Sequence, residues 1–159
     1  MYFAWGETTG YTGEQVPGVR AFDFASYTGF GISANLTLEQ DAAHVNMGGN
    51  WRMPTEAECQ ELFDNCNVAW TDNYNGTGVA GKVFTSKVNG NSVFLPAAGC
   101  GDDSSVYSVG KAGYYWSASW ESSFNTGIPF VYLFYFDDNN LFMKDIDGYY
   151  GCSVRAVCE

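Results

Sequence analysis

The order of apolar and polar residues in the last third of the chain predicts short strands joined by polar turns. An apolar run at Val131–Phe136 is followed by the polar segment Asp137–Asn140. Asp and Asn favour turns because their side chains bond their own backbone. A second strand is predicted at Leu141–Lys144, and a third at Ser153–Val157 closes the chain.

The faces of these strands leave two interpretations open. Successive side chains of a strand point to opposite sides, so an inward face for Leu141 and Met143 places Phe142 outward. In the preceding strand both faces are apolar, one with Phe134 and Phe136 and the other with Leu133 and Tyr135. Either that strand is buried on both faces, or an apolar face binds a partner, since leaving a Phe exposed forgoes roughly 1.5–3 kcal/mol of burial.

Upstream, helical spacing behind two capping boxes predicts two helices. Residues 37–47 are expected to form the first helix, and residues 51–66 are expected to contain the second. Ser or Thr followed three residues later by Glu or Gln caps a helix start, and both segments have this spacing. The capping pairs are Thr37 with Gln40 and Thr55 with Glu58, and the apolar stripe of the second helix comprises Ala57, Cys59, Leu62 and Cys66.

A hairpin is predicted between the second helix and the aromatic last third. Val83–Val88 and Ser92–Leu95 alternate in polarity, and Asn89–Gly90 between them is a preferred hairpin turn. At the start of the chain, Tyr2–Trp5 has the composition of a strand, whereas Gly101–Lys111 is predicted to be a polar loop.

Length and composition fit one loop-rich globular domain. The chain has 159 residues with 19 glycines, and 18% of its residues are aromatic. Its formal net charge of −11 argues against binding to nucleic acid and to anionic membrane surfaces. No apolar run approaches the length needed for membrane insertion. Because domain-like sequence begins directly after Met1, we expect the sequence to be a fragment of a longer protein.

Residues that usually carry catalysis or bind metals are few. His44, on a predicted helix, is the one histidine, which is too few for a Cys/His zinc cluster, and we expect it to be structural. The five cysteines form no CxxC motif and cannot all pair, so scattered free thiols are expected. Asp102–Asp103 and Asp137–Asp138 lack the spacing of a calcium loop, so turn chemistry is expected there. We therefore predict no metal and no cofactor.

Several segments of the chain share motifs with a known family. They are WRMPTEAE from Trp51, NSVFLPAAG at Asn91–Gly99, YWSAS at Tyr115–Ser119 and GCSVRAV at Gly151–Val157. In these motifs the chain resembles a large Bacteroidetes family known as the Fibrobacter succinogenes major paralogous domain. The first motif is similar to the R-L-P-T-E-A-E-W signature of the formylglycine-generating-enzyme superfamily, with Met53 and Cys59 at the differing positions. The resemblance implies one α+β domain of C-type-lectin-like fold over residues 1–159, with two helices packed on a small, twisted, mostly antiparallel sheet.

The resemblance also implies a function. Some members resemble the variable proteins of diversity-generating retroelements, in which rewritten adenine codons diversify a C-terminal binding surface. Residues 119–152 are rich in the residue types that such rewriting produces, between constant-looking framework positions such as Trp116, Phe136 and Val154. We therefore expect a non-catalytic protein of a bacterial cell or phage surface that binds an unknown macromolecule, a protein or a surface glycan, through a variable region at 113–157. The expected contact residues are Trp120, Ser122, Phe124, Leu133, Tyr135, Phe142, Lys144, Asp145, Ile146, Asp147, Tyr149 and Tyr150.

Two other functions stay open. The same fold without diversification would serve as a constitutive adhesive or structural module of a bacterial surface lipoprotein. A divergent formylglycine-generating-type enzyme is the second alternative, because that class uses a C-terminal cysteine pair with which Cys152 and Cys158 invite comparison. The surrounding sequences GCSV and AVCE do not match the active-site pattern of that class. Only Arg155 is close enough in sequence to supply the positive charge that a reactive thiolate needs.

Overall fold

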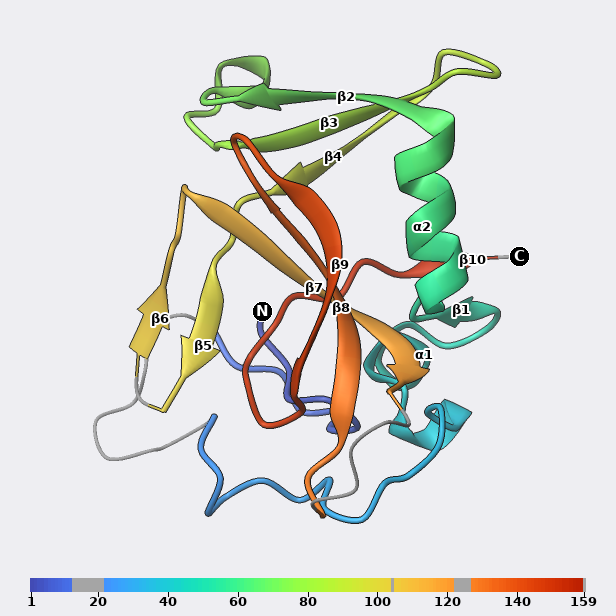
Figure 1. The fold of residues 1–159 in the computed structure, drawn as a ribbon, viewed down its shortest axis with the longest axis vertical. Coiled ribbons are helices and arrows are strands. Elements are labelled where there is room, and N and C mark those ends of the chain that lie inside the picture. Colours follow the sequence, from blue (N-terminus) through green and yellow to red (C-terminus); the bar gives the residue numbers. More distant parts are fainter. Residues whose placement is uncertain (13–21, 104, 122–126, 159) are drawn as a thin grey trace.

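The fold is α+β, with two helices and mostly antiparallel sheets (Figure 1). The computed structural model describes residues 1–12, 22–103, 105–121 and 127–158. Its helices are α1 (Ala42–Met47) and α2 (Glu56–Asn65), with short 3₁₀ turns at Leu38–Gln40 and Tyr74–Gly76. Its strands are β1 (Trp51–Arg52), β2 (Cys66–Thr71), β3 (Gly81–Ser86), β4 (Ser92–Pro96), β5 (Cys100–Asp102), β6 (Ser105–Tyr107), β7 (Ala112–Trp120), β8 (Phe130–Asp137), β9 (Leu141–Asp147) and β10 (Val157–Cys158).

The central sheet consists of β7, β8 and β9 in that order, so β8 is paired on both edges. Both faces of β8 are buried as well. Val131 and Leu133 pack with Trp116 in one core cluster, while Phe134 and Phe136 belong to a second cluster on the other face. Of the two interpretations of this apolar strand, two-sided burial therefore holds for most of its length, as expected for a strand in the middle of a covered sheet.

A second sheet of β2, β3 and β4 lies across the top of the molecule in Figure 1 and packs against the cluster that contains Phe134 and Phe136. Helix α2 lies along one side of the molecule and leads directly into the start of β2. The predicted hairpin is confirmed as β3 and β4, which pair from Gly81 with Pro96 to Thr85 with Ser92. Phe84 and Leu95 of this hairpin are buried in the cluster that contains Phe134. Strand β2 was not predicted.

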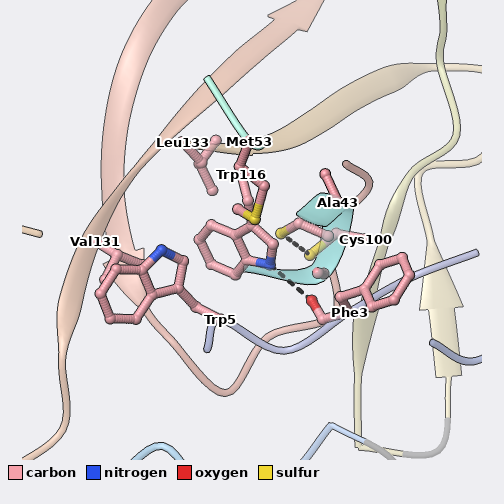
Figure 2. Packing of buried hydrophobic residues seen from close by; sticks show 10 residues of the cluster. Phe3, Trp5, Ala43, Met53, Cys100, Trp116, Val131 and Leu133 are labelled. Carbon is pink, nitrogen blue, oxygen red and sulfur yellow. Dashed lines mark hydrogen bonds between the residues drawn. The ribbon is translucent and has the colours of Figure 1, made fainter. Parts of the chain in front are cut away.

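Trp116 stands in the middle of the first core cluster (Figure 2). Its side chain is fully buried, and its indole N–H donates to the carbonyl oxygen of Phe3 at 2.7 Å. Trp5 beside it donates from its indole N–H to the carbonyl oxygen of Ser117 at 2.9 Å. Both indole donors are thus satisfied inside an apolar cluster, which is the usual condition for burying a Trp.

The predicted capping box of α2 is confirmed. The hydroxyl of Thr55 accepts from the backbone N–H of Glu58 at 3.3 Å, and the Glu58 carboxylate accepts from the backbone N–H of Thr55 at 2.8 Å. The same carboxylate forms a two-pronged ion pair with Arg52 at 2.7 and 2.8 Å. The predicted stripe of α2 is wrong at Ala57, which is exposed, whereas Cys59 is buried.

The prediction of a continuous helix over residues 37–47 is wrong, because the helical conformation is interrupted at Asp41. The 3₁₀ turn Leu38–Gln40 ends there and α1 begins after it. The buried carboxylate of Asp41 accepts from the backbone N–H groups of Ala43 at 2.8 Å and His44 at 3.0 Å, which caps α1. It also accepts from the backbone N–H of Met53 at 2.8 Å, so one side chain caps the helix and fixes the segment that leads to α2.

Three strand predictions need correction. Strand β9 runs on to Asp147, beyond the predicted Lys144. The closing strand predicted for 153–157 is reduced to β10, which pairs with β1, and to an isolated bridge of Ser153 with Tyr115. The strand predicted for 2–5 consists of isolated bridges, one of which pairs Phe3 with Cys152.

Candidate functional site

Four aromatic rings form a continuous row across strands β6, β7, β8 and β9. The ring centroids are 6.0 Å apart for Tyr107 and Tyr114, 5.1 Å for Tyr114 and Tyr135, and 4.9 Å for Tyr135 and Phe142. The two ends of the row are exposed, at 38% for Tyr107 and 44% for Phe142, and the two middle rings are half-buried. We call these four residues the aromatic row.

Strand register puts three of the four rings in line. Tyr135 of β8 pairs with Tyr114 of β7 on one side and with Phe142 of β9 on the other. Directly opposed residues of antiparallel strands point to the same face, so the three rings must be neighbours. Two residues along on this face come Trp116 and Leu133, which are fully buried. The aromatic row therefore lies at the boundary between the buried part and the exposed part of this face of the sheet.

Lys144 extends the same face next to the row. It pairs with Leu133, and it follows Phe142 by two positions, so both side chains leave β9 on one side. Lys144 is exposed, and it places a positive charge beside the exposed ring of Phe142. The surface thus combines rigid apolar area with one cation, in a protein whose formal net charge is −11.

Burial and hydrogen bonds shift the pKa values of Tyr135 in the row and of Asp137 beside it. The Tyr135 hydroxyl donates to the Asp137 carboxylate at 2.8 Å, and burial together with this bond raises the pKa of Tyr135 to about 12. The side chain of Asn140, and then the Tyr135 hydroxyl, hold the pKa of Asp137 at about 2. Asp137 also accepts from the backbone N–H groups of Asn139 at 2.9 Å and Asn140 at 2.7 Å, which builds the predicted turn. The carboxylate is engaged in the turn and orients the Tyr135 ring.

Two cysteines meet beneath the row. The sulfur atoms of Cys100 and Cys152 lie 3.5 Å apart, and both side chains are buried. The hydrogen bond with Cys152 lowers the pKa of the Cys100 thiol, whereas burial raises the pKa of Cys152 well above its usual value. Burial also raises the pKa of Tyr107, whose hydroxyl lies next to Cys100.

Cys59, Cys66, Cys100 and Cys152 are free thiols, as expected, but Cys100 and Cys152 are not scattered. The sequence comparison set Cys152 beside Cys158, but the structure brings Cys152 to Cys100, and Cys158 is exposed on β10. Cys100 comes close because Gly101 and Gly151 bridge the two segments with hydrogen bonds of 2.7 and 2.8 Å. The two cysteines are 52 positions apart, so no spacing motif could have revealed the pair.

The residues predicted to contact a ligand divide into several groups. Phe142, Lys144 and Asp145 are exposed, and Trp120, Tyr135, Ile146, Asp147, Tyr149 and Tyr150 are half-buried. Leu133 is fully buried, so its assignment to a contact surface is wrong; β8 is covered at that point by the core around Trp116. Ser122 and Phe124 lie outside the described residues.

The strand alternation of β9 splits the predicted set further. Asp145 leaves β9 on the face opposite to Lys144. Ile146 follows Lys144 by two positions on the same face, and Ile146 and Trp120 both pair with Val131 at the edge of the first core cluster. Tyr149 and Tyr150 stack on each other at 4.7 Å, in the turn after β9. The structure therefore brings Tyr135, Phe142 and Lys144 together, with Ile146 and Trp120 farther along the same face, and places the remaining described members elsewhere.

Sequence reasoning missed Tyr107 and Tyr114 as members of the row. Tyr107 fell in a segment predicted to be a polar loop, although that loop contains β6. The pairing of Tyr114 with Tyr135 depends on strand register, which the bulge between Trp116 and Trp120 obscures in the sequence. An aromatic residue within a short alternating stretch, Ser105–Tyr107, was the signal available for Tyr107.

No protein-family model, curated protein or solved structure matches the chain. Over the described ranges, neither helix has the length and apolar character that crossing a bilayer requires. In the same part of the chain, no three His, Cys, Asp or Glu side chains are grouped as metal ligands.

Proposed function

We propose that the protein is a non-catalytic binding module of C-type-lectin-like fold whose ligand contacts the aromatic row and Lys144. The ligand would be a macromolecule, a protein or a surface glycan, and the module would be displayed on a bacterial cell or a virion. The resemblance of the sequence motifs to the Fibrobacter succinogenes major paralogous domain family supports the fold. The exposed rings of the row support the binding surface.

The observation that carries the proposal is the exposure of Phe142 and Tyr107 at the two ends of the aromatic row, whose rings meet edge-on or tilted. Water contact of large rings has a free-energy cost, and such rings gather where a partner covers them. Tyr and Phe also lose little conformational entropy on binding because they have few rotatable bonds. The fully buried Trp116 and Leu133 behind the row provide the rigid support that such a surface needs.

The pattern along β9 supports diversification of this surface. Leu141 and Met143 pack against the second core cluster, while Phe142 and Lys144 between and after them are exposed. Changes at the exposed positions would alter the contact surface and leave the inward positions untouched. A sheet that alternates in this way can display variable residues on a constant frame, as the variable proteins of diversity-generating retroelements do.

Binding assays with matched variants test the proposal. Purified protein would be screened on arrays of bacterial and host glycans and on immobilised outer-membrane proteins. For each ligand found, Phe142→Ser and Tyr135→Ser should weaken binding at least about tenfold, since central aromatic contacts often cost 2 kcal/mol or more when removed. Val88→Ser, at an 87% exposed residue in the β3–β4 turn, is the control and should bind as the parent protein does. Equal binding by the parent and Phe142→Ser would overturn the assignment of the surface.

The gene neighbourhood separates a diversified module from a constitutive one. A reverse-transcriptase gene with a nearby template repeat that differs from the coding repeat only at adenines would support diversification. Natural variants should then differ at positions 142 and 144 and agree at 141 and 143. A neighbourhood without these elements, together with retained binding to one ligand, would favour the constitutive adhesive module.

A further inference from the structure

A separate open pocket of about 260 Å³ lies on the other side of the central sheet. It is lined by Leu62 of α2, Leu95 of β4 and Phe134 of β8, and by the segment from Arg155 to Val157 that leads into β10. Phe134 alternates with Tyr135 along β8, so the pocket opens on the face opposite to the aromatic row. The binding surface proposed above does not include it.

The polar side chains in the pocket wall are nearly all engaged elsewhere in the protein. The Glu58 carboxylate is paired with Arg52, and the hydrogen bond from Arg52 holds its pKa at about 2. The Tyr115 hydroxyl donates to the carbonyl oxygen of Pro96 at 2.7 Å. The indole N–H of Trp116 donates to Phe3.

The thiol of Cys59, also in the wall, is neutral. Burial raises its pKa to about 12, and the nearby carboxylates of Glu58 and Glu56 act in the same direction. A neutral thiol behaves as a small apolar group with a weak donor. It therefore adds to the apolar part of the lining.

Arg155 differs from these groups. Its side chain lines the pocket and is exposed, and over the described ranges its guanidinium forms no hydrogen bond or ion pair. A guanidinium offers donors in a planar fork that matches a carboxylate in a two-pronged contact. An apolar chamber with one such group at its wall is suited to a ligand with an apolar body and one anionic end.

We propose that this pocket binds a small apolar monocarboxylate, with its hydrocarbon body against Leu62, Leu95 and Phe134 and its carboxylate on Arg155. The volume corresponds to about nine water molecules at roughly 30 Å³ each, just below the usual range for ligand pockets of about 300–1,000 Å³. A compact arylalkanoic acid or a medium-chain fatty acid has this size. The net charge of −11 repels anions at a distance, so the affinity arises from contact inside the pocket.

A matched pair of probes tests the charge requirement. 3-Phenylpropionate and 3-phenylpropanol have the same apolar body, and only the first carries a carboxylate. Titration of the full chain, followed by two-dimensional amide NMR, should show saturable shifts for the acid at residues around the pocket, and at least about tenfold weaker binding of the alcohol. Equal binding of both probes, or shifts centred on the aromatic row, would overturn the proposal.

Variants then assign the contact. Arg155→Gln should reduce binding of the acid to the level of the alcohol and leave the alcohol unchanged. Lys111→Gln removes one exposed positive charge elsewhere and should leave both unchanged. Phe142→Ser should also leave acid binding unchanged, so a failure here is distinguishable from a failure of the proposed macromolecular surface. Leu62→Phe, if it melts like the parent, should weaken both probes by filling the chamber. Unaltered acid binding in Arg155→Gln would refute the assignment.

Discussion

The indole N–H of Trp116 and the carbonyl oxygen of Phe3 are joined by a 2.7 Å hydrogen bond across 113 positions of sequence. The Phe3 peptide also exchanges two hydrogen bonds with Cys152, of 2.9 and 3.0 Å. The beginning of the described chain is thus held between β7 and the segment after β9. It forms part of the core beneath the aromatic row, so the stability of the row's support depends on it.

Trp116→Ala should destabilise the protein by about 3–5 kcal/mol, as large-to-small changes at fully buried aromatic residues do. The change also leaves the Phe3 carbonyl oxygen without its indole donor. Urea unfolding followed by circular dichroism would measure the loss. Trp51→Ala, at a 39% exposed Trp of β1, serves as the control and should cost far less. A loss below 1 kcal/mol for Trp116→Ala would contradict the packing described for the first cluster.

Asp41→Ala should cost about 2–4 kcal/mol. Loss of a helix cap costs about 0.5–2 kcal/mol, and the buried N–H of Met53 would lose its acceptor at about 1–3 kcal/mol more. Asp41→Asn should cost less, because an amide oxygen can still accept. Chemical unfolding of the two variants would test this order. If both variants cost the same, the three hydrogen bonds to the carboxylate do not carry the effect.

Phe142→Ser should leave the free energy of unfolding within about 0.5 kcal/mol of the parent, as surface changes usually do. Leu133→Ala, on the middle strand of the same sheet, should cost about 2–5 kcal/mol. The contrast follows from the 44% exposure of Phe142 against full burial of Leu133. Similar losses for both variants would mean that the aromatic row is part of the core.

The thiols should react with a disulfide reagent in two classes. Cys158 is exposed and Cys66 is half-buried, so both should react in the native protein, Cys66 more slowly, whereas Cys59, Cys100 and Cys152 are buried and should react only on unfolding. Accessible thiolates react, and buried neutral thiols do not. Absorbance of the released thiol, with and without urea, would count each class. Rapid native reaction in a variant with both Cys66→Ser and Cys158→Ser would contradict the burial of the remaining three thiols, which include the pair beneath Tyr107.

These residues show what the sequence could predict. Periodicity and capping chemistry are local, so the Thr55–Glu58 box, the β3–β4 hairpin and the outward position of Phe142 were found from the sequence. Contacts between distant segments carry no local signal. The meeting of Cys100 with Cys152, and the row formed by Tyr107, Tyr114 and Tyr135, arise from strand register across loops.

The prediction of one continuous helix over residues 37–47 failed at Asp41 for a different reason. Its carboxylate serves a partner outside its own helix, the Met53 backbone, and this tertiary contact breaks a helix that local propensity would continue. The assignment of Leu133 to the contact surface failed because the sequence of a strand that is apolar on both faces does not reveal which positions a neighbouring element covers. Identifying the aromatic row as a whole therefore required the structure, whereas its most exposed member, Phe142, could be identified from the sequence.

The ion pair of Arg52 and Glu58 should make stability depend on pH at the acid end. Arg52, named first among the causes, lowers the pKa of Glu58 from 4.5 to about 2 in the folded protein. Its contribution is therefore fully present above about pH 5 and is lost as the pH falls through about 2. Both side chains are partly exposed, so solvent screening limits the contribution to about 1 kcal/mol or less.

Glu58→Gln isolates this charge, because Gln can also complete the capping box. The free energy of unfolding of the parent should exceed that of Glu58→Gln by up to about 1 kcal/mol at pH 7, and the difference should shrink toward zero between about pH 5 and pH 2. Urea unfolding at several pH values within this window would measure it. Glu61→Gln removes an exposed charge from the same helix and controls for the change in net charge. A difference that stays constant or grows as the pH falls would show that Arg52 does not stabilise the ionised carboxylate of Glu58.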